Sequence, residues 1–328
     1  MPGFTSVRQA FSAVRKEIFD FSFSYPLEIV PEAGPKDSLD YYLYSDKLAW
    51  SAMRMDAKGV PATWYRQTGT RYWPAYVAWY GLVNLGHYLR RNDRAYLEIF
   101  EQQIDWLEAN AMVREDGAVV WPMKFDYFVG QLLLKAPWIS AHAQGLAISA
   151  LVRGWRVFRR PRLLELLRGS GRIFGLTVPE GGIRISFNNQ FLYTEVPGGP
   201  SPGILDGFMT SLLGLYDLLV ETQDAEVKLL FDEGIAGLKS ALPYWNYRDK
   251  WSWYSRRAYL SPPAYHCSHY LLLETMSRLT NESVFRHYAA LWDPIRLSLL
   301  DRSEIYVTFL YTKNRCRLKH RTWNQTAA

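Results

Sequence analysis

Four pairs of helical patterns recur from residue 74 onward, and this repeat restricts the possible folds more than any other feature of the chain. The period is about 60–65 residues, which accommodates a helix hairpin and an inserted segment. The first helix of each pair begins with small or polar residues and continues as nearly unbroken apolar sequence, which is typical of a helix buried on most sides. The second helix is amphipathic with a charged outer face. The predicted pairs are 75–91 with 95–111, 139–158 with 161–176, 204–221 with 225–242, and 265–279 with 283–299.

Buried inner helices surrounded by amphipathic outer helices predict an α/α toroid, although an α-solenoid has a similar periodicity. The inserts 113–137, 177–202 and 243–264 contain glycine, proline and alternating apolar residues, which predict β-hairpins. Each insert follows an outer helix and precedes an inner one, so we expect all three on one face, at the N-termini of the inner helices. Insertions on one face are typical of a binding face. We therefore predict a mainly α fold, an incomplete (α/α) toroid of about four helix hairpins with β-hairpin insertions on one face.

The residues before the repeat differ in composition. Residues 1–25 predict an amphipathic helix with Phe11, Val14, Ile18 and Phe19 on one side, and residues 26–73 predict loops and short strands that form one wall. The expected division is residues 1–73, an N-terminal helix with short strands packed on the toroid, and residues 74–328, the toroid domain.

Composition limits the function classes. The aromatic content of 16%, with 13 Trp and 22 Tyr, exceeds the needs of an ordinary core. Surplus Trp and Tyr favour a site for an amphipathic ligand such as a sugar, and the alternative is that they pack helix pairs together. The net charge of +6 is compatible with an anionic ligand, but the chain lacks the dense Lys/Arg runs of nucleic-acid-binding proteins.

Cofactor and membrane motifs are missing from the sequence. No apolar run reaches the ~20 residues of a membrane span, and the N-terminus does not resemble a signal peptide. With only two cysteines, a reducing compartment is favoured, so we expect a soluble, cytoplasmic protein. His266 and His269 are three residues apart, but no glutamate has the spacing of a metalloprotease motif. GxSxG, P-loop and GxGxxG motifs do not occur, so no metal or nucleotide is predicted.

The inserts carry the side chains that could bind a ligand. The stretch 251–270 concentrates tyrosine, arginine and histidine around Pro262 and Pro263, which predicts a loop or hairpin that brings phenols and guanidiniums to a cleft. The first insert leads to Trp138, His142 and Gln144. The second insert contains Asn188, Tyr193 and Glu195.

Three segments also resemble a known family. The three segments are WISAHAQGLAISALVR, EVPGGPSPGILDGFMTSLLGLYDL, and WYSRRAYL with PPAYHCSHY. They are similar to the C-terminal catalytic domain of the D-glucuronyl C5-epimerases, which convert glucuronate to iduronate in heparan-sulfate-type chains. The resemblance extends from about Trp73 to the C-terminus, and it implies an α/α toroid. It also implies the catalytic residues Glu195, Tyr254, Arg257 and Tyr265, and it matches Asn188 to a family asparagine. The chain departs from the family at Val196, where the family has tyrosine. Either Tyr193 replaces that phenol, or the base works without it, or substrate or activity has changed.

The reaction that the resemblance implies requires two groups across a sugar ring. One removes the C5 proton, and the other returns a proton from the opposite face while a cation neutralises the substrate carboxylate. We assign Glu195 to one face and Tyr265 to the other, Arg257 to the carboxylate, and Tyr254 to a hydrogen bond beside it. Because a free tyrosine has a pKa near 10, we expect Arg257 or Arg256 to help ionise Tyr265. The scheme requires no cofactor.

The implied partner is an anionic polysaccharide that contains uronate, and exposed aromatics on the toroid wall would permit a homodimer. Three alternatives remain open: a polysaccharide lyase that abstracts the same proton, a glycoside hydrolase that pairs Glu195 with Asp126, Asp206 or Asp249, and a glycan-binding module without activity. The candidate substrate-binding residues are Arg66, Arg71, Tyr72, Lys124, Trp138, His142, Gln144, Asn188, Tyr193, Arg256, His266 and His269.

Overall fold

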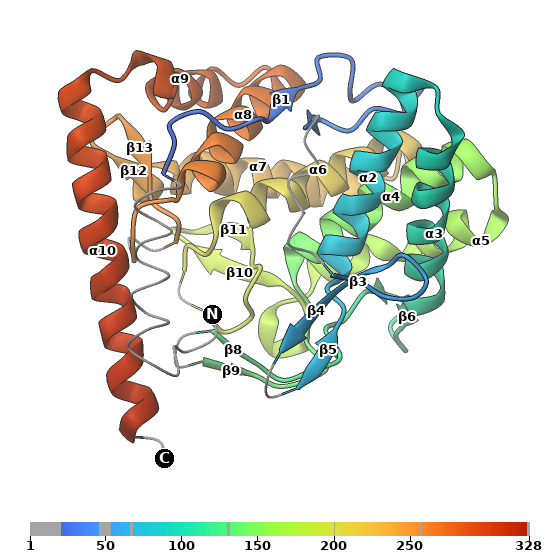
Figure 1. Cartoon of the computed structure of the whole chain (residues 1–328). Helices are drawn as coiled ribbons and strands as arrows, with labels where there is room; N and C mark the ends of the chain where they lie inside the picture. Colours follow the sequence, from blue (N-terminus) through green and yellow to red (C-terminus); the bar gives the residue numbers. More distant parts are fainter. Residues whose placement is uncertain are drawn as a thin grey trace.

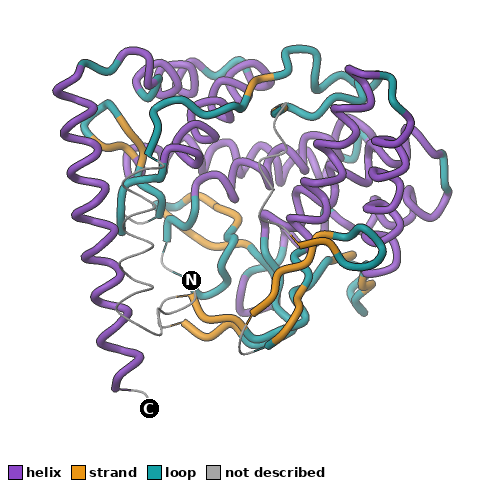
Figure 2. Tube along the Cα trace, in the orientation of Figure 1, coloured by secondary structure: helices purple, strands orange, loops and turns teal. Residues whose placement is uncertain are grey.

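The computed structural model describes residues 21–45, 54–65, 68–129, 132–199, 201–255 and 258–326, and it is mainly helical with small antiparallel sheets (Figures 1 and 2). Most of the helix predicted for residues 1–25, including Phe11, Val14, Ile18 and Phe19, lies outside the described residues.

The helix pairs of the repeat are confirmed. The inner helices are α2 (Pro74–Arg91), α4 (Ala141–Phe158), α6 (Leu205–Thr222) and α8 (Pro263–Thr280), each 18 residues long. Helix α2 packs on α4, α4 on α6, and α6 on α8. Helices α4 and α6 approach closely because glycines face each other: a Cβ at Gly145 would overlap the backbone of Ser211, and one at Gly214 would overlap Gly145. Their contact therefore depends on positions without a side chain.

The outer helices are α3 (Arg94–Asn110), α5 (Pro161–Ser170), α7 (Ala225–Trp245) and α9 (Ser283–Leu291), and each packs on the inner helix before it. Each inner helix ends at a C-cap residue in the left-handed region, and the next residue is the extended N-cap of the outer helix. The same two-residue connection thus reverses the chain in every pair. The C-cap residues are Asn92, Arg159, Gln223 and Asn281, with φ of 53°, 54°, 55° and 58°.

Two outer helices are shorter than predicted. Helix α5 stops at Ser170 and continues as a 3₁₀ turn (Arg172–Gly175). Helix α9 ends at Leu291 rather than near residue 299, because Pro294 has no N–H to donate and Asp293 caps a 3₁₀ turn (Pro294–Arg296) instead. Helix α10 (Leu299–Thr326), which is 28 residues long, follows this turn and was not predicted.

The hairpins predicted in the inserts are present. The first insert contains β6 (Met112–Val113) paired with β7 (Val119–Val120), and β8 (Tyr127–Val129) paired with β9 (Leu132–Leu134). The second contains β10 (Arg184–Phe187) with β11 (Gln190–Tyr193), and the third contains β12 (Asn246–Tyr247) with β13 (Trp251–Ser252). A 3₁₀ turn (Val178–Glu180) precedes β10.

Two of these inserts contact the N-termini of inner helices. The Thr194 carbonyl accepts a 3.0 Å hydrogen bond from the N–H of Ala141, the first residue of α4. Ser255 forms a β-bridge with Ile204, the N-cap of α6. The second insert therefore lies beside the N-terminus of α4, and the third insert lies beside the N-terminus of α6.

The N-terminal segment forms β1 (Glu28–Ile29) with β2 (Leu43–Tyr44), and a three-stranded sheet of β3 (Arg54–Met55), β4 (Pro61–Tyr65) and β5 (Gly69–Arg71). In Figure 1, β1 runs along the top, whereas β4, β5, β8 and β9 lie at the bottom. The segment that carries β1 and β2 contacts the later turns of the inner helices. There Arg153 and Asp217 form a buried ion pair of 2.6 Å, and the Tyr42 hydroxyl donates to Asp217 over 2.7 Å. The ion pair and the hydrogen bond from Tyr42 offset the free-energy cost of burying these two charges.

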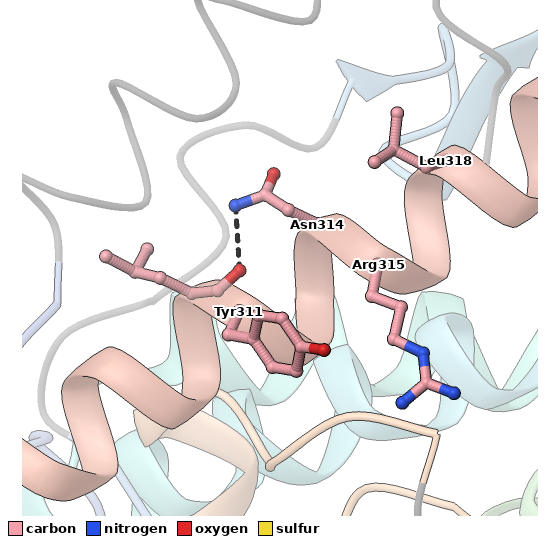
Figure 3. Close-up of a pocket in the computed structure, with 5 residues that line it drawn as sticks. Tyr311, Asn314, Arg315 and Leu318 are labelled. Carbon is pink, nitrogen blue, oxygen red and sulfur yellow. Dashed lines mark hydrogen bonds between the residues drawn. The ribbon is translucent and has the colours of Figure 1, made fainter.

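Helix α10 runs along one side of the structure. Its inner side packs Ile305 and Phe309 against Trp251 and Leu260. A surface hollow of about 480 Å³ on this helix is lined by Leu310, Tyr311, Asn314, Arg315 and Leu318, and it contains none of the predicted site residues (Figure 3). Across the described part of the chain, the helices are too short or too polar to cross a bilayer.

Candidate active site

The inner helices each carry a polar side chain in the first turn, on the second or third residue of the helix. Helix α2 contributes Tyr76, α4 contributes His142, α6 contributes Asp206, and α8 contributes Tyr265. These side chains interact electrostatically with one another or with Glu195, which follows β11. The first turns of the repeat therefore converge on Glu195.

Glu195 lies against the first turn of α6. A Cβ at Gly207 would overlap the Glu195 Oε2 atom, so the carboxylate occupies space that only glycine leaves open. The His142 Nδ1 atom lies 3.3 Å from the same oxygen. Both side chains are 24% exposed, which leaves them accessible to a ligand. The positive end of the α6 dipole also favours a carboxylate here.

The pKa of His142 reflects two opposing effects. Burial of the imidazole lowers the pKa, but the hydrogen bond and charge of Glu195, together with the charge of Asp206, raise it above its ordinary value. The imidazole is therefore protonated over a wider pH range than a free histidine.

Tyr265 presents its phenol at the same place, with the residue 41% exposed. Its ring packs edge-on against Tyr254 with centroids 4.9 Å apart, and Tyr254 stacks on Tyr259. Loss of hydration, followed by the negative charge of Asp206 and the influence of Tyr76 and Glu195, raises the pKa of Tyr265, while a hydrogen bond with Tyr254 acts in the opposite direction. Tyr265 is therefore a neutral phenol at rest.

The expectation that Arg256 or Arg257 helps to ionise Tyr265 stays a prediction, because both arginines lie outside the described residues. The described neighbours that shift the pKa of Tyr265 include the carboxylates of Asp206 and Glu195, which favour the protonated phenol. Arg66, Arg256 and Arg257, which were predicted to contact the substrate, lie outside the described residues.

His266 and His269 lie behind this site and are buried. The Ser252 N–H donates to His266 Nδ1 over 3.2 Å, so the His266 Nε2 carries the proton and donates to the Trp292 carbonyl over 2.8 Å. The Ser252 hydroxyl also contacts His269 Nδ1 at 2.7 Å. These contacts hold both rings in the wall of the site rather than at its surface, and the predicted direct contact of either ring with substrate has no support here.

His269 reaches the site through Asp206. Its Nε2 atom lies 3.6 Å from Asp206 Oδ1, and neither atom has a closer hydrogen-bond partner among the described residues. Burial acts to raise the pKa of Asp206, but His269 and the charge of His142 outweigh it and lower the pKa. Asp206 is therefore a buried carboxylate held in its ionised form between two histidines.

Aromatic side chains border the other side of Glu195. Burial and the charge of Glu195 raise the pKa of Tyr76 to about 12, and the same two causes raise the pKa of Tyr127. Tyr127 stacks on Trp138, whose Nε1 donates to the Phe125 carbonyl over 3.0 Å. Trp138 is 7% exposed and acts as a packing residue in this aromatic wall.

Two predicted site residues are core residues. Tyr193 is 1% exposed, and its hydroxyl donates to the Leu230 carbonyl over 2.5 Å. Gln144 is fully buried and donates to the carbonyls of Val119 and Ser170. Tyr193 is therefore unavailable to replace the phenol expected at Val196, because its hydroxyl is committed to α7.

Other predicted residues lie apart from Glu195. Asn188 occupies the β10–β11 turn with φ of 48°, a conformation that asparagine tolerates better than most residues, and its amide donates to the Tyr244 hydroxyl over 3.4 Å. Arg71, Tyr72 and Lys124 line a separate pocket of about 100 Å³ together with Trp106 and Asn110. That pocket contains two cations beside aromatic rings.

Sequence reasoning missed Tyr76 and Tyr127, and it named Asp206 only as a partner for a hydrolase. The equivalent position of Tyr76, His142, Asp206 and Tyr265 in successive inner helices was the signal that could have identified Tyr76 and Asp206. Among the described residues, no group of three or more His, Cys, Asp or Glu side chains is arranged to hold a metal ion.

Comparisons with known proteins show the family of this chain. The sequence model of the D-glucuronyl C5-epimerase C-terminus matches residues 115–294, more than half of the chain. The chain therefore belongs to the D-glucuronyl C5-epimerase C-terminal family.

Two curated relatives are also similar to this chain in sequence. The D-glucuronyl C5-epimerase of Caenorhabditis elegans is 28% identical over 211 residues, which cover 59% of this chain and 34% of the relative. An uncharacterized protein of Methanocaldococcus jannaschii is 25% identical over 178 residues, 53% of this chain and 57% of the relative. The chain thus matches about a third of the first relative and little more than half of the second.

Proposed function

We propose that this protein inverts C5 of D-glucuronate units, to L-iduronate, in a heparosan-like polysaccharide. The observation that carries the proposal is that Glu195 lies against the first turn of α6 and acts electrostatically on the Tyr265 phenol in the first turn of α8, in a chain of the C5-epimerase family. The proposal includes an incomplete (α/α) toroid formed by residues 74–328, with residues 1–73 packed on it.

The reaction begins with an ionised Glu195. Its carboxylate takes the C5 proton, and the electron pair of the broken C–H bond moves into the substrate carboxyl group. The neutral Tyr265 phenol then donates its proton to C5 from the opposite face. The protonation state of Tyr265 supports this direction, because burial and the charges of Asp206 and Glu195 raise the pKa of its phenol.

The developing negative charge on the substrate carboxyl group requires stabilisation. The first turns of α2, α4, α6 and α8 carry the positive ends of the helix dipoles, which favour a negative charge beside them. In this proposal Arg257 pairs with the carboxylate, and Tyr254 holds the Tyr265 ring in place through their edge contact. Arg71 and Lys124 would then bind the anionic group of a neighbouring sugar in their own pocket.

The missing tyrosine at position 196 is compatible with this scheme. Val196 cannot donate a hydrogen bond from its side chain, and the Tyr193 hydroxyl is already bonded to Leu230. His142, at 3.3 Å from Glu195, is the described polar side chain that contacts the base directly. In this chain the base therefore has an imidazole partner in place of a phenol.

Incubation of the protein with heparosan in deuterated water tests the proposal. NMR should detect deuterium at C5 and the appearance of iduronate, and Glu195→Gln or Tyr265→Phe should abolish both. Glu165→Gln and Tyr311→Phe are matched controls, because both side chains are exposed and distant in sequence from the site.

Other outcomes identify other functions. A shortened chain with a new conjugated double bond would identify a lyase, since elimination at C4 would then follow proton abstraction. Binding of heparosan without any C5 exchange would identify a non-catalytic glycan-binding protein. Either result would refute the epimerase proposal.

A further inference from the structure

His142 occupies a position that structural support alone does not require. It is the second residue of α4, its side chain is 24% exposed, and its Nδ1 atom lies 3.3 Å from Glu195 Oε2. The helix is capped without it, because the Ser140 hydroxyl accepts from the Ala143 N–H. The imidazole therefore contributes to the site and not to the helix start.

The groups that face His142 come from several elements. Glu195 approaches from the segment after β11, and Asp206 from the first turn of α6. Tyr76 of α2 and Tyr127 of β8 lie near Glu195 and stay neutral, since burial raises the pKa of each. Among the residues that the structure describes, the charged groups that act on the imidazole are these two carboxylates.

Proton balance shows why such a group is needed. One turnover in the proposed reaction leaves Glu195 as a carboxylic acid and Tyr265 as a phenolate. The next glucuronate can react only after a proton has left Glu195 and another has returned to Tyr265. Glu195 lies against the α6 first turn, and its Oε2 atom is 3.3 Å from His142 Nδ1, so the imidazole can accept the Glu195 proton once it has released its own to water.

We propose that His142 is a positioning residue for Glu195 that also carries its proton: it keeps the carboxylate ionised before the reaction and passes the abstracted proton to water afterwards. This inference rests on the proposed epimerase function. After abstraction the Glu195–His142 pair holds two protons. The pair releases one to water, the remaining proton moves from Glu195 Oε2 to the imidazole, and Tyr265 takes one from water, so no net proton is gained or lost.

The pKa direction of the histidine agrees with this role. With Glu195 ionised, the charge of the carboxylate raises the pKa of His142, and protonation of Glu195 removes that charge. The pKa of the imidazole then falls at the moment when the pair must release a proton. Asp206, held ionised beside His269, keeps the imidazole from losing its charge before the reaction.

His142→Asn tests the inference, because the amide keeps a donor near the Nδ1 position but cannot carry a proton. We expect the first turnover of C5 exchange to persist as a burst, and the steady-state kcat to fall by about 10²-fold. The pH dependence of the steady-state kcat that follows the titration of His142 should be lost in the variant. Added imidazole should restore part of the steady-state rate. His287→Asn, at an exposed position on α9, is the matched control.

The outcomes separate this inference from the proposed function. Absence of C5 exchange in the wild-type protein refutes the epimerase itself. Normal exchange together with an unchanged kcat and pH profile in His142→Asn overturns the role of His142. Should that variant fail to fold, NMR titration of His142 in the wild type and in Glu195→Gln decides: we expect a lower imidazole pKa in the variant, and equal values overturn the inference.

Discussion

Gly207→Ala should lower the activity of this protein without lowering its stability. Gly207 is the third residue of α6 and is buried beneath the Glu195 side chain. An added Cβ would overlap Glu195 Oε2 and lie 3.0 Å from Glu195 Cδ and 3.1 Å from its Cβ. The overlapping Oε2 atom is the far end of a flexible side chain and can swing away, whereas the Glu195 Cβ is attached to the backbone and must shift by a few tenths of an ångström.

The two effects of Gly207→Ala have opposite signs. A carboxylate displaced by about 1 Å from the reacting carbon loses about 10²-fold in rate, or about 2.7 kcal/mol of transition-state stabilisation. Helix α6 gains up to about 1 kcal/mol, because alanine is a better helix former than glycine. We therefore expect a folded protein with an equal or higher Tm and a kcat about 10²-fold lower.

The assay is C5 deuterium exchange into heparosan, followed by NMR, with thermal unfolding measured on the same samples. Gly175→Ala is the control, because a Cβ there would meet Leu230 at an ordinary 3.9 Å. A Gly207→Ala protein that is folded and retains kcat within about threefold of wild type would contradict the placement of Glu195 over α6. A loss of activity that follows a loss of fold would contradict the helix argument.

Three further predictions concern other parts of the structure. Tyr193→Phe should lower the free energy of unfolding by about 1 kcal/mol, because the hydrogen bond to Leu230 is lost, and should leave kcat unchanged. A large fall in kcat would show that Tyr193 takes part in the reaction. Arg153→Met should cost about 3–5 kcal/mol in urea denaturation, because it leaves Asp217 buried without its cation, and a loss below about 1 kcal/mol would show that the pair is not buried in solution. The pKa of His142 is raised on folding, so the stability that its charge contributes is complete below the unfolded pKa of about 6.5 and disappears as pH rises through the folded pKa. The stability difference between wild type and His142→Asn should accordingly be larger at acidic than at alkaline pH, and a difference independent of pH would argue against a charged imidazole.

The candidate site was only partly predictable. Glu195 and Tyr265 were named through the family resemblance, and the charge of Glu195 is among the causes that raise the pKa of Tyr265. Tyr193, two residues before Glu195, was expected nearby, but β11 directs its ring into the core between Phe174 and Phe208. Closeness along the chain did not imply closeness in space, because the backbone leaves the strand between these two residues.

The sequence by itself determined the inner and outer helices and the hairpins between pairs, since apolar periodicity and turn residues act over a few positions. Tertiary structure alone decided which side chains surround Glu195. Tyr76, His142 and Asp206 are far apart in sequence, and they meet because α2, α4 and α6 pack side by side in the same direction, a result of glycine contacts such as Gly145 against Ser211. The end of α9 and the long α10 also depended on one local break, at Asp293 and Pro294, within an otherwise helical pattern.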